Sequence, residues 1–192
     1  MKNIRPLIDE HDSFLTEPCL DFSFDQMTID PGEIKQLLFD NMEYYKGVGL
    51  SSNQIGLPYK VFSMVHEGQN LILFNPEIVE QSTDLIIEEE GCLSYPGLYV
   101  KIKRPKSVNV TYYDEEGELF YALFSDLSCR IFLHEMDHMN GKIFYEQSTK
   151  YHLQEGKRKR RINLRKLKGN NSTLWQSHIN NKELRKNSLG TL

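Results

Sequence analysis

The sequence predicts an α+β fold: a helix near the N-terminus, a middle region of mostly antiparallel β-sheet, a second helix, and a basic C-terminal extension. Apolar residues recur at helical spacing in two stretches, short β-rich runs lie between them, and Lys and Arg accumulate at the end. With 192 residues and 39% hydrophobic content, the chain fits one domain with an ordinary core.

The first helix is predicted from about Pro31 to Lys46. Asp30 is in the N-cap position, Pro31 is the first helical residue, and Glu33 stands where a capping box requires it. Its apolar stripe comprises Ile34, Leu37, Leu38, Met42 and Tyr45. This spacing is typical of a helix that packs one face on a core.

The region from Tyr59 to Phe124 contains short runs rich in β-branched and aromatic residues. They are "YKVFSMV", "LILFNPEIV", "KSVNVTYY" and "LFYALF", and "DEEGE" between the last two indicates a hairpin turn. The sequence therefore predicts antiparallel strands here.

A second helix is predicted from Asp126 to Met139, ending at Asn140 and Gly141. It contains "FLHEMDHMNG", in which two histidines lie four residues apart. His134 and His138 therefore share one helix face and can turn toward one ion, with Glu135 beside it. The same pattern also fits the solvated face of an ordinary helix.

A metal site needs a third ligand. In one protease class the third ligand is a histidine three residues after the glycine of the motif, but this chain has Phe144 there. In another class it is a downstream glutamate, and here Glu155 or Glu183 would have to serve from inside the basic tail. Neither alternative is attractive. Cys92, which follows a strand in "EEEGCLSYPG", is a better candidate, and a Cys-His-His set leaves a fourth position for water. The alternative is that Cys92 is a small buried hydrophobe.

Three motifs occur in order: "GVGLSSNQ" (Gly47–Gln54), "EGCLS" (Glu90–Ser94) and "HEMDH" (His134–His138). In this respect the chain resembles the peptide deformylases. The resemblance covers residues 1–147 and implies a catalytic domain of antiparallel sheets packed around a central metal-binding helix. Residues 148–192 lie outside it, as a basic extension that is helical in part.

The resemblance implies a role for each matching residue. By this resemblance, one divalent metal is bound by Cys92, His134 and His138, and Glu135 is the general base and acid. The oxyanion is faced by Gln54 and the backbone N–H of Leu93. The peptide pairs with the backbone of Val48 and Gly49. The implied activity is removal of the formyl group from formylmethionine of nascent chains, with release of formate. The family implies Fe²⁺, with Ni²⁺, Co²⁺ or Zn²⁺ able to substitute, while the ligand types also suit zinc.

Two rival functions stay open. One is an inactive homologue that binds formylated or other peptide ends, and the other is a zinc protease of the ordinary helix-motif kind. The chain departs from the family at Ser51 and Ser52, where alanines are usual, and at Leu133, where glutamine is usual. We expect both serine hydroxyls to bond backbone groups, because an unpaired buried hydroxyl is costly. Leu133 is expected to change either the polar surroundings of the metal or the way the loop is held.

Two arginines are expected near the histidines of the second helix, one on the helix itself and one outside it. Arg130 lies four residues before His134, on the same face, where it either lines the substrate groove or extends into solvent. Asp137, between the two histidines, is expected to pair with Arg104.

The charge is divided along the chain. Residues 1–141 hold 10 Lys and Arg against 24 Asp and Glu, and residues 142–192 hold 13 against 3. The densest basic stretch, "GKRKRRINLRKLKG" (Gly156–Gly169), predicts a helix that rests lightly on the body or orders on a partner. Since family members with a C-terminal helix dock at the ribosome, we expect phosphate contacts with ribosomal RNA; a merely solubilising tail is the alternative.

The N-terminus "MKNIRPLIDE" has no apolar signal region, and no run approaches the roughly 18 apolar residues of a membrane span. The sequence therefore predicts a protein that is neither secreted nor bound to a membrane, in the cytoplasm, or in an organelle interior or host cytoplasm if organellar or viral. Its three cysteines are expected to be reduced thiols.

Overall fold

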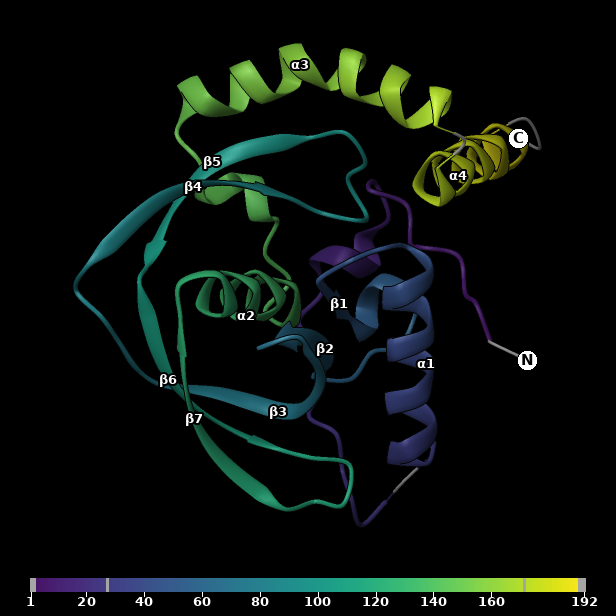
Figure 1. Cartoon of the computed structure of the whole chain (residues 1–192). Helices are drawn as coiled ribbons and strands as arrows, with labels where there is room; N and C mark the ends of the chain where they lie inside the picture. Colours follow the sequence, from purple (N-terminus) through teal and green to yellow (C-terminus); the bar gives the residue numbers. More distant parts are fainter. Residues whose placement is uncertain (1–2, 27, 171, 190–192) are drawn as a thin grey trace.

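A central helix lies between two antiparallel sheets in the computed structural model, which describes residues 3–26, 28–170 and 172–189, with side chains as far as residue 181 (Figure 1). The helices are α1 (Pro31–Tyr44), α2 (Asp126–Met139), α3 (Lys150–Gly169) and α4 (Thr173–Leu189), with short 3₁₀ helices η1 (Ser13–Thr16), η2 (Ser52–Ile55) and η3 (Phe144–Gln147). The predicted α+β class is confirmed.

The larger sheet has the strand order β1-β2-β3-β6-β7, and the smaller sheet pairs β4 with β5. Their bounds are β1 (Gly49–Ser51), β2 (Val61–His66), β3 (Gln69–Gln81), β4 (Leu85–Gly91), β5 (Tyr99–Pro105), β6 (Ser107–Tyr113) and β7 (Leu119–Ser125). All pairs within these sheets are antiparallel, as predicted. Four strands coincide with the predicted runs, whereas β1 and β5 were not identified as strands.

Helix α1 begins as predicted but ends two residues earlier. Asp30 Oδ1 accepts a hydrogen bond of 3.1 Å from the Glu33 amide, which caps the first turn. At the other end Lys46 has φ of 56°, and the Gly47 amide bonds back to the Met42 carbonyl at 2.9 Å. The left-handed residue terminates the helix and directs the chain into β1.

Helix α2 has the predicted bounds and is buried from Cys129 to Met139. One face packs with Phe62, Phe124 and Met64 of the larger sheet, and the opposite side faces β5. Gly141 then reverses the chain with φ of 65°, where any side chain would collide with the Thr16 carbonyl. The helix is therefore enclosed on both sides, which holds its polar residues in fixed positions.

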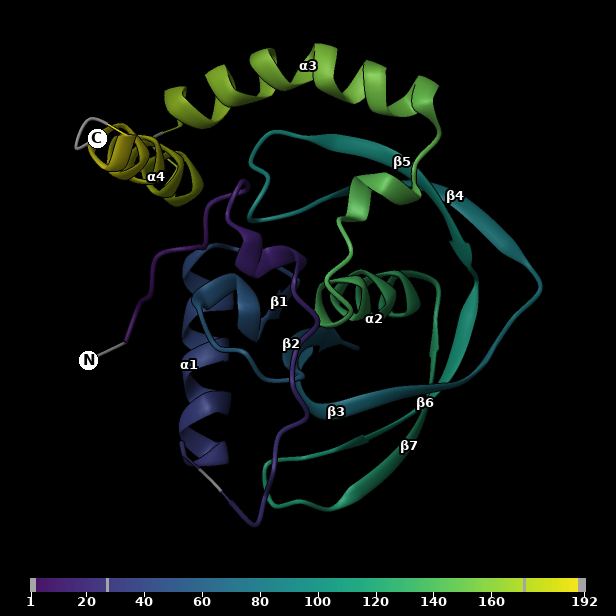
Figure 2. The same ribbon diagram turned by 180° about the vertical axis from the view of Figure 1, so that it is seen from behind.

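The C-terminal helices lie on the surface of the body, and α3 rests on it lightly, as predicted, because Gly156 is the buried residue of that helix. Helix α3 lies along β5, and Figure 2 shows α4 following it toward the N-terminal segment. Leu153 joins the cluster that contains Val100 and Phe144, and a side chain at Gly156 would collide with the Tyr99 carbonyl. None of the described helices is long and apolar enough to cross a membrane.

Candidate metal centre

Three potential metal ligands meet where the end of β4 faces α2. Cys92 follows β4, while His134 and His138 project from successive turns of α2, and one ligand atom of each lies within 4.8 Å of the others. Cys92 Sγ lies 3.2 Å from His138 Nε2. Tetrahedral zinc, with bonds of about 2.3 Å to sulfur and about 2.0 Å to nitrogen, would place such a pair about 3.5 Å apart. The donors therefore fit one divalent ion.

A buried carboxylate orients the first histidine. Glu90 Oε2 lies 3.2 Å from His134 Nδ1, which leaves His134 Nε2 free to face the other ligands. Glu90 in turn accepts hydrogen bonds from Arg104 at 2.7 and 2.9 Å and from Arg130 Nη1 at 2.6 Å. A carboxylate on the second ring nitrogen is the usual support of a metal-binding histidine.

The electrostatics favour a cation between these groups. Burial alone raises the pKa of Glu90, but the hydrogen bonds from Arg104 and His134 outweigh it and hold that pKa at about 2. Burial lowers the pKa of His134, yet Cys92 and Glu90 raise it to about 10. Burial lowers the pKa of His138 well below its usual value. The Cys92 and Glu90 groups thus stabilise positive charge where a metal would bind.

Glu135 lies on α2 beside the three ligands without joining them. It is buried, and its Oε2 atom has no hydrogen-bond partner among the described residues. Burial raises the pKa of Glu135 to about 7, although His134 and the Ser51 hydroxyl offset part of the rise. Gly49 passes so close that a side chain there would collide with Glu135 Oε1. A carboxyl group of this pKa can both take and give a proton near neutral pH.

Gln54, on η2, directs its amide nitrogen toward the same place. Nε2 donates to Cys92 Sγ at 3.3 Å and to Ser94 Oγ at 3.2 Å, while Oε1 accepts from the Ser51 amide at 3.0 Å. Asn53 Nδ2 donates to the His138 carbonyl at 3.1 Å, which ties η2 to α2. The two amides therefore tie η2 to the Cys92 segment through Gln54 and to α2 through Asn53.

The three departures from the family have separate surroundings. Ser52 donates to the Tyr59 carbonyl, so its predicted backbone partner is confirmed. Ser51 forms a capping box at the start of η2, in which its side chain faces the Gln54 backbone, in line with the expected backbone partner. Its hydroxyl also contacts the side chains of Asn53 at 2.8 Å and Gln54 at 3.0 Å. Leu133 is buried in the apolar cluster between α2 and the larger sheet. The contacts described for Leu133 are with apolar residues, so they do not explain an effect of Leu133 on the metal.

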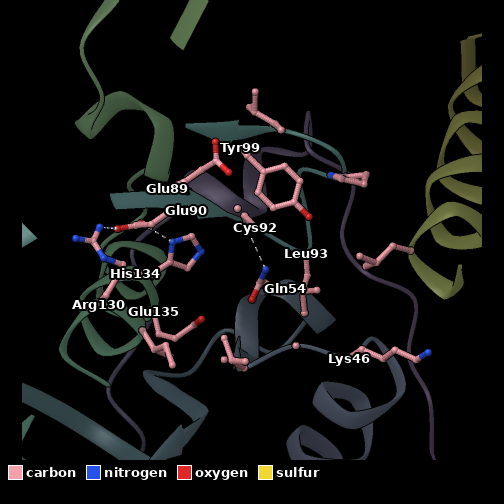
Figure 3. Close-up of a pocket in the computed structure, with 18 of the residues that line it drawn as sticks. Lys46, Gln54, Glu89, Glu90, Cys92, Leu93, Tyr99, Arg130, His134 and Glu135 are labelled. Carbon is pink, nitrogen blue, oxygen red and sulfur yellow. Dashed lines mark hydrogen bonds and ion pairs between the residues drawn. The ribbon is translucent and has the colours of Figure 1, made fainter. Parts of the chain in front are cut away.

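The remaining predicted site residues surround one cavity of about 310 Å³. Val48 and Gly49 line one side, and Leu93 follows Cys92 along the wall. Strand β1 is at the edge of its sheet and, among the described strands, pairs with β2 alone, so its other edge is open to an extended peptide. Figure 3 shows Gln54, Glu135 and His134 around the cavity, with Glu90 bridging His134 and Arg130.

Arg130 lines this cavity and does not extend into solvent. Its guanidinium is buried, with Nε 2.9 Å from Glu88 and Nη1 bonded to Glu90. The predicted pairing of Asp137 with Arg104 is also confirmed, because Arg104 Nη1 lies 2.8 Å from Asp137 Oδ2. Both arginines thus converge on the carboxylates around His134.

Glu90 is one residue of this site that sequence reasoning missed. It stands inside the motif that contains Cys92, and the two residues are on the same side of an extended chain because they are two apart. The two-residue spacing of Glu90 and Cys92 was therefore the signal in the sequence that could have identified Glu90. The two arginines that bind Glu90 come from β5 and α2, far along the sequence, and the motif does not indicate them.

Comparison with known proteins gives a consistent result. A family model described as polypeptide deformylase matches residues 4–154. The chain is 41% identical over 117 residues to peptide deformylase 1B, chloroplastic/mitochondrial, of Arabidopsis thaliana, covering 58% of this chain and 43% of that protein. It is 36% identical over 115 residues to a peptide deformylase of Synechocystis, covering 57% and 62%. The chain thus spans less than two thirds of these relatives' length.

A solved structure shares the fold. The peptide deformylase of Synechococcus elongatus in complex with actinonin has a TM-score of 0.74 and 30% identity, over 83% of this chain and 90% of that one.

Proposed function

The chain belongs to the polypeptide deformylase family, and from that premise we propose that it is a metal-dependent hydrolase that removes the formyl group from N-terminal formylmethionine of nascent polypeptides. Water attacks the formyl carbon, the bond from that carbon to the methionine nitrogen breaks, and formate and a free amino terminus result. The proposal rests most directly on one observation: the Cys92, His134 and His138 ligand atoms converge at a cavity wall that also carries Glu135 and Gln54.

The metal, bound by Cys92, His134 and His138, would supply a positive charge that polarises the formyl oxygen and acidifies water. Glu135 takes the proton of the attacking water and delivers it to the leaving nitrogen, a role that its pKa near 7 supports. The Gln54 amide and the Leu93 backbone N–H donate to the developing oxyanion. These donors are neutral and fixed, as such a role requires.

The peptide binds in extended form against β1. The Val48 carbonyl already accepts from the Val65 amide at 2.8 Å, so the remaining backbone groups of Val48 and Gly49 offer the hydrogen bonds of the sheet edge. Addition of a strand there orients the formyl end toward Glu135. Arg130 forms part of the opposite wall and also holds Glu90 in place. Recognition is therefore mainly through backbone groups, which suits substrates of varied sequence.

Fe²⁺ is the metal we propose, from the resemblance to the family. Zn²⁺, Ni²⁺ and Co²⁺ are the alternatives, and the Cys-His-His set suits zinc by ligand type. Purification without oxygen, followed by metal analysis, tests this assignment. Iron in the active preparation supports it, and full activity with zinc as the metal present contradicts it.

The activity is tested with formyl-Met-Ala-Ser as substrate. We expect formate and Met-Ala-Ser as the products. Cleavage of an internal peptide bond would instead indicate an ordinary zinc protease, and binding without any cleavage would indicate an inactive homologue that captures peptide ends. The three outcomes are chemically distinct, so one analysis of the products separates them.

We also propose that α3 binds ribosomal RNA. Its inner face packs on the body through Leu153 and Gly156, while the outer face carries exposed cations: Lys157, Arg158, Lys159, Arg161, Arg165, Lys166 and Lys168. Such a row of cations suits phosphate contacts near the exit of a nascent chain. The protein would then act in the compartment where formylated chains are made, either a cytoplasm or an organelle interior.

A further inference from the structure

The C-terminal helix α4 contributes to the wall of the cavity. Leu174, in its first turn, lines the same cavity as Cys92 and Glu135. The family model matches residues 4–154, so Leu174 lies outside the matched segment. This chain thus adds a side chain to the site from a part of the sequence that the shared motifs do not cover.

Three hydrogen bonds hold α4 where Leu174 reaches the cavity. Thr173 Oγ1 donates to the Tyr44 carbonyl at the end of α1, at 3.2 Å. Two turns later Asn181 Nδ2 donates to the Leu7 carbonyl at 3.0 Å, and before the helix the Ser172 amide donates to the Leu167 carbonyl at 3.1 Å. Because these anchors lie on both sides of Leu174, its position is fixed against the body.

Leu174 lies in an apolar part of the cavity. Leu93, Pro96 and Leu174 line both the main cavity and a small hollow next to it, so the three side chains are neighbours. Leu93 and Leu174 also pack against the same core cluster as Tyr45. The cavity wall is therefore apolar here, while the polar groups of the reaction lie at the metal.

The direction of β1 relates this apolar wall to the metal. Gly49 is close enough to touch Glu135, whereas Gly47, two residues earlier, touches Leu93: side chains at these glycines would collide with Glu135 Oε1 and Leu93 Cδ1, respectively. A peptide that follows the chain from Gly49 to Gly47 moves from the reacting groups toward Leu93 and its neighbour Leu174. Each extended residue advances about 3.3 Å, so this wall is reached by residues after the formylated one.

We propose that Leu174, Leu93 and Pro96 form a subsite for an apolar side chain in the residues that follow formylmethionine. This inference rests on the proposed deformylase activity and adds a preference within it. Apolar surface at Leu174 is buried when such a side chain binds, and that burial favours the complex. A formylated residue with nothing after it does not reach the subsite.

The test compares kcat/KM for formate release from formyl-Met-amide, formyl-Met-Gly-Gly-amide and formyl-Met-Leu-Leu-amide. The intact protein should favour Leu-Leu over Gly-Gly. Leu174→Ala should reduce that preference by about 10-fold, the low end of the discrimination that a methylene contact in an apolar pocket supplies. The same variant should lower kcat/KM for formyl-Met-amide less than it lowers kcat/KM for formyl-Met-Leu-Leu-amide, and Leu174→Met should retain the preference.

Ile179→Ala is the matched control, because Ile179 is on α4 but is not among the residues that line the cavity. It should retain the full preference for Leu-Leu. If Leu174→Ala lowers kcat/KM equally for all three substrates, or leaves the preference intact, the subsite is wrong while the deformylase activity stands. If the intact protein releases formate from none of them, the proposed function is wrong and the subsite fails with it.

Discussion

Glu135 is buried beside the ligands with one oxygen unpartnered among the described residues, so its carboxyl group is available for proton transfer. Glu135→Gln keeps the size of the side chain and removes the base. We expect it to retain metal and fold while formate release falls by about 10²- to 10⁴-fold, the usual contribution of general acid–base catalysis. Glu89→Gln, which changes an exposed carboxylate of the same cavity, is the control and should stay near full activity. Normal turnover of Glu135→Gln would remove this residue from the mechanism.

Ser51 is placed to affect catalysis, because its single hydroxyl proton is shared among Asn53, Gln54 and Glu135. A neutral hydrogen bond contributes about 0.5–1.5 kcal/mol, which corresponds to a fall in kcat of roughly 2- to 10-fold for Ser51→Ala. The Ser51 amide still holds Gln54 Oε1 in this variant, so a larger loss is not expected.

Ser52→Ala provides the control for that measurement. Ser52 bonds the Tyr59 carbonyl and contacts neither Gln54 nor Glu135 through any hydrogen bond described for it. We expect it to lower the melting temperature slightly and to leave kcat unchanged. An equal loss of kcat in both serine variants would show that Ser51 acts only through the packing of the loop.

At the scale of elements, the Arg104–Asp137 ion pair joins β5 to α2. Removing one partner of a buried pair leaves the other charge uncompensated, which is strongly destabilising. A double-mutant cycle of Arg104→Gln and Asp137→Asn, measured by unfolding in denaturant, should give a coupling energy of at least about 1 kcal/mol.

The exposed pair of Arg158 and Glu155 on α3 is the matched control for this cycle. Its coupling should be below about 0.5 kcal/mol, because solvent screens exposed charges. Additive effects of Arg104→Gln and Asp137→Asn would mean that the two elements are held together by other contacts.

The approximate bounds of helix α2 could be predicted from its sequence, because an apolar period and a C-terminal Asn-Gly are local signals. Strand β5 was missed although Val100, Ile102 and Arg104 alternate toward the interior, since one of the three inward positions is an arginine. The side chain of Arg104 faces inward, where it bonds the Glu90 carboxylate of β4, and a contact between strands is not visible in a local pattern. Strand β1, with three residues, is too short to show alternation.

The convergence of Cys92, His134, His138 and Glu135 could be anticipated because each belongs to a short motif whose spacing has a chemical meaning. The Glu90 network could not, since it depends on side chains brought together from β4, β5 and α2. Leu174 was missed for the same reason: nothing in the basic tail indicates that one leucine reaches the cavity.

At the scale of the whole molecule, positive charge is concentrated on the outer face of α3, whereas residues 1–141 are acidic. Replacing Lys159, Arg161 and Lys166 by Glu should abolish a salt-sensitive association with ribosomes. The reason is that contacts between cations and phosphates supply the salt-dependent part of binding to nucleic acid, and these three contacts would be lost. Hydrolysis of a short formyl peptide should be unchanged. Truncation after Lys150 is a poorer test, since it also removes Leu153 and Leu174 from the packed body and the cavity wall.

The control for this charge reversal is the replacement of Lys101, Lys103 and Lys106, which are exposed cations outside α3. It should leave ribosome binding in place. If the full chain does not bind ribosomes at low salt, or if the α3 variant binds as well as the unaltered protein, α3 serves solubility and not docking.

The central claim is that one divalent ion joins the end of β4 to α2 through Cys92, His134 and His138. The most direct test is the metal content per chain of Cys92→Ala, purified without oxygen beside the unaltered protein. We predict one metal ion per chain in the unaltered protein and nearly complete loss in the variant, because two histidines alone are a weak site. Retention of stoichiometric metal by Cys92→Ala would contradict this account.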